Sequence, residues 1–119
     1  MSGTRTLTLS AHAAIETVAA PAIMAAPFLL GFGQVAGALA FAVGALLLGL
    51  AVQTVSPGRT IPLSAHAAFD YVLAALAIVG GLVVGLGAGD WGATSFLVGI
   101  GVAMVALTAS TRFTVAVGA

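Results

Sequence analysis

Four long apolar stretches alternate with three short breaks along the chain. The apolar stretches cover about 10–31, 34–55, 64–86 and 94–111, and the breaks read GFGQ at 31–34, SPGRTIP at 56–62 and GAGDWGAT at 87–94. Because crossing about 30 Å of hydrocarbon takes roughly 20 helical residues, each stretch is long enough to span a membrane. The pattern predicts an all-α, integral membrane four-helix bundle that forms a single membrane domain over residues 1–119.

Composition supports a membrane protein over a soluble one. The chain is 61% hydrophobic and only 5% charged, whereas about a quarter of the residues in soluble domains are charged. Three basic and three acidic residues give a net charge of zero, so we expect the lipid bilayer as a partner and no nucleic acid. The absence of cysteine excludes disulfides, thiolate metal sites and cysteine nucleophiles.

The arginines predict the orientation of the four spans. Arg5 precedes the first span, Arg59 lies between the second and third, and Arg112 follows the fourth. With four spans all three lie on one side, and by the positive-inside rule that side is cytoplasmic. Asp90 and Trp91 lie on the opposite side. We therefore expect a multi-pass protein of the cell inner (plasma) membrane with both termini in the cytoplasm.

One phrase occurs twice in the sequence. LSAHAAIE at 9–16 returns as LSAHAAFD at 63–70 and carries both histidines and two of the three carboxylates. The phrase predicts two parallel two-helix hairpin repeats, about 5–55 and 59–112, because an even number of spans per repeat keeps both halves in the same orientation. A cleaved signal peptide at the N-terminus is disfavoured, since its apolar region would contain a histidine and a glutamate.

The repeated phrase predicts a polar cluster inside the bundle. Residues four apart share one face of a helix, so His12 lies above Glu16 and His66 above Asp70. Ionisable groups in a spanning helix usually face the bundle interior. Because the repeats are parallel, we expect the two histidines at equal depth near the cytoplasmic side, with the carboxylates one turn deeper.

Five neighbouring residues are expected to support this cluster. Arg5 and Arg59 lie close to it at the cytoplasmic ends of their spans. Ser10 and Ser64 precede helical runs and are expected to be N-caps. Tyr71 follows a cluster carboxylate and either donates to it or anchors its helix at the interface.

Three interpretations of the cluster remain open at this stage. The first is a polar clamp that holds the halves in register. The second is a site for a metal ion or for a b-type haem; in the haem case His12 and His66 would be the axial ligands, and Arg5 and Arg59 would meet the propionates. The third is a proton relay. We favour binding or relay of a cation, a proton or a metal ion, by a homo-oligomer. The alternative is a structural or partner-binding membrane subunit. An enzyme is not expected, because little besides the cluster could perform chemistry.

Glycine spacing predicts close helix contacts. Gly33 and Gly37, and Gly81 and Gly85, have the GxxxG spacing that lets helix backbones approach in a membrane.

The stretch AAPFLLGF at 25–32 ends the first span and precedes a Gly/Ala-rich second span. It resembles the SPW-repeat membrane proteins, small prokaryotic proteins with a two-helix repeat, and Ala26, Pro27 and Phe28 stand where Ser-Pro-Trp is expected. The second half reads Gly80, Gly81 and Leu82 and lacks the motif. The resemblance implies a membrane-embedded two-helix repeat and no particular activity.

Overall fold

A computed structural model of the chain describes residues 5–58 and 60–114. Within these residues the chain forms four α-helices: α1 (Leu9–Leu30), α2 (Gln34–Val55), α3 (Leu63–Ala88) and α4 (Trp91–Ala109). All four are long and apolar enough to cross a membrane. The predicted spans agree with helices α1, α2 and α3 to within two residues at each end. The fourth helix begins three residues earlier than expected.

The helix starts correct one prediction. Ser10 and Ser64 are not N-caps, because each helix begins one residue before its serine, and both serines lie exposed in the first turn. The N-cap of α1 is Thr8, whose hydroxyl accepts a hydrogen bond of 3.1 Å from the backbone N–H of Ala11. Helix α3 follows Pro62 and has no side-chain cap.

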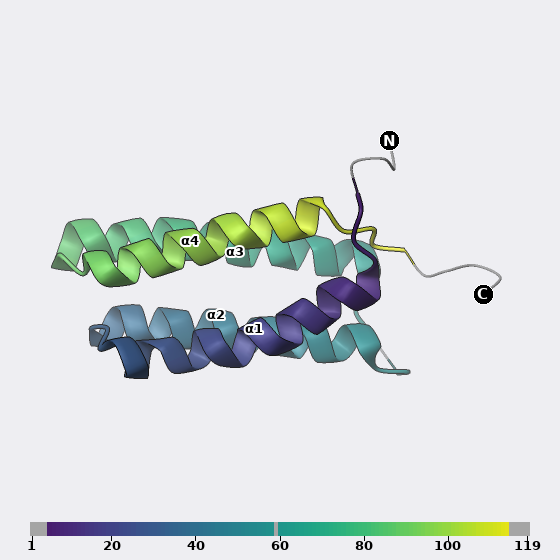
Figure 1. Cartoon of the computed structure of the whole chain (residues 1–119), viewed down its shortest axis with the longest axis horizontal. Coiled ribbons are helices and arrows are strands. Elements are labelled where there is room, and N and C mark those ends of the chain that lie inside the picture. Colours follow the sequence, from purple (N-terminus) through teal and green to yellow (C-terminus); the bar gives the residue numbers. More distant parts are fainter. Residues whose placement is uncertain (1–4, 59, 115–119) are drawn as a thin grey trace.

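The helices pack as two antiparallel hairpins, α1 with α2 and α3 with α4, and the hairpins meet mainly where α2 packs against α3. Helices α1 and α3 begin at the same end of the bundle. The described segments before α1 and after α4 lie at this end too (Figure 1). They lie diagonally across the bundle, since their backbones do not come close to one another. This arrangement confirms the predicted all-α four-helix bundle.

The two hairpin turns are tied together at the other end of the bundle. Helices α1 and α3 each end at a glycine, Gly31 and Gly89, with φ of 70° and 69°, a left-handed conformation that favours glycine. After the second turn, the Asp90 carboxylate caps α4 by accepting from the Ala93 N–H. It also accepts a hydrogen bond of 2.9 Å from the Gly33 N–H of the first turn. One side chain therefore links both hairpins.

The glycines of the GxxxG pairs lie at helix contacts of different tightness. Gly81 and Gly85 face α4, and an added Cβ at Gly81 would lie 2.9 Å from the Cβ of Leu97. Gly33 and Gly37 lie near the α1–α2 turn, where an added Cβ would be 3.3 and 3.4 Å from the nearest side-chain atoms.

Two further glycines, outside those pairs, bring backbones together within each hairpin. A Cβ at Gly44 in α2 would lie 2.9 Å from the carbonyl oxygen of Ala20 in α1. A Cβ at Gly101 in α4 would lie 2.8 Å from the carbonyl oxygen of Ala74 in α3. Both hairpins are thus held by close backbone approach, the packing mode expected in lipid.

Candidate functional site

Four ionisable side chains meet between α1 and α3 at the end of the bundle where both helices begin. Helix α1 supplies His12 and Glu16, and α3 supplies His66 and Asp70. Each side chain is at most 4% exposed. One ligating atom from each lies within 4.8 Å of the other three. The structure therefore brings together all four residues of the repeated phrase that were predicted to form a cluster.

The contacts run both within and between the helices. His12 Nε2 lies 3.1 Å from Glu16 Oε1 and 2.9 Å from Asp70 Oδ2. His66 Nε2 lies 3.5 Å from the same glutamate oxygen and 3.1 Å from the same aspartate oxygen. Each histidine Nε2 thus faces one carboxylate of its own helix and one of the diagonal helix.

Four of the six distances among the ligand atoms, 2.9 to 3.5 Å, are close to the edge length of a coordination tetrahedron. Ligands about 2.0 Å from a zinc ion, placed tetrahedrally, are about 3.3 Å from one another. Only the contact between His12 and Asp70 has hydrogen-bond geometry. In the described part of the chain, Glu16 Oε1, His66 Nε2 and Asp70 Oδ1 are buried without a hydrogen-bond partner. A buried polar atom left unpaired is costly, so the cluster has the capacity to hold a further group.

Two threonines that the sequence pattern did not predict contact the outer nitrogens of the imidazoles. Thr54, at the end of α2, lies with Oγ1 2.8 Å from His66 Nδ1. Thr111, just after α4, lies with Oγ1 2.8 Å from His12 Nδ1. Each threonine thus bonds the histidine of the other hairpin. Their side of the bundle could have been predicted from their positions at the ends of the second and fourth spans, because these ends lie at the same side of the bundle as the starts of the first and third spans, which carry the histidines.

A short strap places Thr111 over the cluster. Leu7, before α1, pairs with Thr111 in a parallel bridge, through a hydrogen bond of 2.9 Å from Leu7 N–H to Ser110 C=O and one of 3.0 Å from Arg112 N–H to Leu7 C=O. The ring of Phe113 lies 5.1 Å from that of His12 and 5.5 Å from that of His66, measured between centroids. Leu7, Thr111 and Phe113, which flank the helices, thus lie at the end of the cluster that the helices leave open.

Of the residues expected to support the cluster, none that the structure describes is buried with it. Arg5, Ser10 and Ser64 are exposed, and Arg59 lies outside the described residues. Tyr71 is 43% exposed on the outer face of α3, consistent with an interfacial anchor. The polar support that was expected from these side chains comes instead from the two threonines.

The arrangement does not fit a bis-histidine haem. A porphyrin would have to pass between the two imidazoles, and the oxygens of Glu16 and Asp70 lie there, within 3.5 Å of both Nε2 atoms. A small cation fits among these atoms, and a macrocycle does not.

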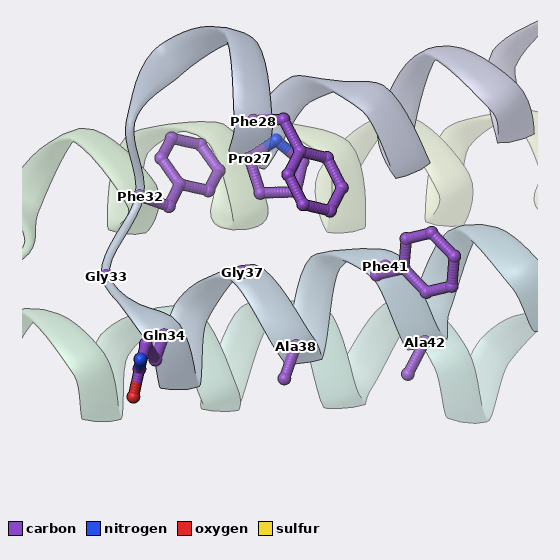
Figure 2. Close-up of a pocket in the computed structure, with 9 residues that line it drawn as sticks. All are labelled: Pro27, Phe28, Phe32, Gly33, Gln34, Gly37, Ala38, Phe41 and Ala42. Carbon is purple, nitrogen blue, oxygen red and sulfur yellow. The ribbon is translucent and has the colours of Figure 1, made fainter.

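A separate apolar groove of about 530 Å³ lies at the opposite end of the bundle, beside the α1–α2 turn. Figure 2 shows Pro27, Phe28 and Phe32 on one side of it and Phe41 on α2. Pro27 and Phe28 belong to the stretch that resembles the SPW motif. The groove has no ionisable side chain in its lining, so the candidate chemistry of the described residues lies in the His/carboxylate cluster.

Comparison with known proteins leaves the cluster as the main guide to function, and the resemblance to SPW-repeat proteins stays a prediction. No protein-family model, no curated protein and no solved structure matches the chain.

Proposed function

We propose that this chain is a plasma-membrane protein that binds one divalent transition-metal ion, of which Zn²⁺ is the best example, at His12, Glu16, His66 and Asp70. The observation that carries the proposal is the convergence of two Nε2 atoms and two carboxylate oxygens within 4.8 Å of one another. Zinc binds imidazole nitrogen and carboxylate oxygen, and four protein ligands are typical of a structural site. We therefore expect a site that retains its metal without catalysing a reaction.

Charge supports a divalent ion at this position. Two ionised carboxylates and two neutral imidazoles carry a total of two negative charges, and a divalent cation neutralises them. Uncompensated charge inside a membrane is expensive, so a loaded site is electrically suited to its position. An N₂O₂ donor set without sulfur suits Zn²⁺ and similar divalent ions better than Cu(I).

The packing beyond the cluster supports retention of the cation over its passage. Two apolar clusters occupy the interior deeper in the bundle, one around Val43 and Leu47 and one around Leu97. In the described residues, every other buried polar side chain belongs to a threonine. A proton relay would need further titratable groups or water along the interior.

A polar clamp is the second candidate. The contact of 2.9 Å between His12 Nε2 and Asp70 Oδ2 favours it, because with a proton on Nε2 this contact is a hydrogen bond between the two hairpins and needs no metal. Intramembrane polar contacts often stabilise helix association and do nothing more.

The orientation and assembly of the protein are part of the same proposal. The described segments before α1 and after α4 lie at the end of the bundle where α1 and α3 begin (Figure 1), and the positive-inside rule assigns that side to the cytoplasm. The metal would then be drawn from the cytoplasmic pool. The prediction of a homo-oligomer is kept as part of this proposal.

The test is metal binding by the purified full chain in detergent micelles. We expect one Zn²⁺ per chain by elemental analysis, and Co²⁺ substitution should give the intense visible absorption of a tetrahedral site. Asp70→Asn and the double variant His12→Ala/His66→Ala should lose the metal. Asp90→Asn makes the same chemical change at the far end of the bundle and should keep it.

Two results would count against the proposal. If the wild type binds no more Zn²⁺ or Co²⁺ than the double histidine variant, the cluster is a clamp. Equal loss of metal in Asp90→Asn and Asp70→Asn would show that binding depends on general fold stability and does not map to the cluster.

A further inference from the structure

We infer that Thr54 and Thr111 are positioning residues that hold both histidines in the Nδ1–H tautomer, so that both Nε2 lone pairs face the cluster. This inference concerns the ligand atoms of the proposed metal site, and it rests on hydrogen bonds outside the four ligands.

The direction of each hydrogen bond follows from the single proton of a threonine hydroxyl. Thr54 Oγ1 donates to the Leu50 carbonyl at 2.9 Å, and Thr111 Oγ1 donates to the Leu107 carbonyl at 2.6 Å. With its proton engaged, each hydroxyl has only lone pairs left for the imidazole 2.8 Å away. Each histidine Nδ1 must therefore carry the proton and donate it.

Fixing the proton on Nδ1 decides what Nε2 can do. A neutral imidazole has one N–H and one lone pair, so both Nε2 atoms present lone pairs to carboxylate oxygens 2.9 to 3.5 Å away. Lone pairs facing one another repel unless a cation lies between them. Ligating histidines commonly donate their second N–H to a fixed acceptor, which orients the ring and sets the tautomer.

The bonds also cross between the hairpins. Thr54 belongs to the first hairpin and orients His66 of the second, whereas Thr111 follows the second hairpin and orients His12 of the first. Each hairpin alone supplies one histidine, one carboxylate and a threonine for the other histidine. Correctly oriented ligands therefore exist only when the two hairpins are docked.

The experiment compares Thr54→Val and Thr111→Val with two controls. Valine keeps the shape of threonine and removes the acceptor. Thr108→Val is the matched control. Thr108 is also buried, 3% exposed, and lies one turn before Thr111, but the imidazole Nδ1 atoms bond Thr54 and Thr111 and not Thr108. Thr54→Ser and Thr111→Ser are the second control, because they keep the hydroxyl. We expect each valine variant to weaken Zn²⁺ affinity by about 10-fold or more, and Thr108→Val and the serine variants to stay near wild type.

Imidazole ¹⁵N NMR provides a readout that a purely structural role would not change. The chain has two histidines, so each ring can be followed separately. In metal-free protein, at a pH high enough that both rings are neutral, the wild type should show protonated Nδ1 and bare Nε2 on both, and each valine variant should lose this preference at the ring it contacts.

The possible failures are distinguishable. If the wild type shows the Nε2–H tautomer, or if Thr54→Val and Thr111→Val leave both tautomers and Zn²⁺ affinity unchanged, the inference is wrong. If the wild type binds no metal and still shows the Nδ1–H tautomer, which the valine variants lose, the threonines are positioning residues and the proposed metal site is wrong.

Discussion

Adding one methyl group to α2 should change stability in opposite directions at two glycines five residues apart. At Gly44 a Cβ would lie 2.9 Å from the carbonyl oxygen of Ala20 and 2.6 Å from Cγ of Met24. Because ordinary van der Waals contact begins near 3.4 Å, α1 and α2 would have to move apart by several tenths of an ångström. At Gly49 a Cβ meets nothing within 4 Å.

The magnitudes follow from two opposing effects. Replacing glycine by alanine within a helix stabilises it by about 0.5–1 kcal/mol at either position. Overpacking a tight contact costs about 1–3 kcal/mol, and only Gly44→Ala incurs that cost. Gly49→Ala should therefore raise the free energy of unfolding by about 0.5–1 kcal/mol. Gly44→Ala should lie about 1–3 kcal/mol below Gly49→Ala, because the helix gain cancels in the comparison.

The assay is reversible unfolding in mixed micelles with increasing fractions of a denaturing detergent, followed by far-UV circular dichroism. Wild type, Gly44→Ala and Gly49→Ala are compared under identical conditions, so the difference between the two variants isolates the overpacking cost. Equal or greater stability of Gly44→Ala relative to Gly49→Ala would refute the close backbone approach of α1 and α2 on which the description of the first hairpin depends.

Three further predictions concern the caps, the turn link and the cover of the cluster. Thr8→Ala should lower the free energy of unfolding by about 1 kcal/mol, while Ser10→Ala changes it by a few tenths at most; an equal loss in both would restore Ser10 as the cap. Asp90→Ala removes the acceptor for two backbone N–H groups, one of them at Gly33, and should cost about 1–3 kcal/mol in the same unfolding assay, with Asp90→Asn intermediate. Phe113→Ala should speed release of bound Zn²⁺ to a chelator with little change in the equilibrium dissociation constant, and unchanged kinetics would show that the ring does not cover the site.

The helices could be predicted closely because an apolar stretch of about 20 residues between short breaks predicts a helix long enough to span a membrane. The start of α4 was placed late because Asp90 was assigned to the break. Its side chain accepts from the Ala93 N–H and so begins the helix just after it. Asp is a preferred N-cap residue, and the signal was present. At α1, Thr8 and Ser10 both suit a cap, and the local sequence does not choose between them.

The four cluster residues could be predicted because spacing fixes their geometry. His12 and Glu16 share a helix face, His66 and Asp70 share another, and the predicted parallel repeats would place both faces at equal depth. Thr111 could not be placed in this way, because it lies beyond α4 and no helix period extends to it. Its position depends on backbone bonds with Leu7, a pairing between the two ends of the described chain that no local pattern indicates.

The clamp and the metal site are compatible, because the cluster joins the two hairpins at an end of the bundle where few other contacts hold them together. Lipid gives apolar helices little reason to associate, and between the hairpins only α2 and α3 pack extensively. One end is tied by Asp90 and the other by the cluster. A metal ion bound by two ligands from each hairpin would strengthen the second tie, adding about 2.7 kcal/mol to the docked state at a free concentration 100 times the dissociation constant. Metal would then stabilise the docked hairpins, and docking also completes the histidine–threonine hydrogen bonds. Loss of the metal should therefore weaken the contacts between the hairpins at the cluster end before those at the Asp90 end.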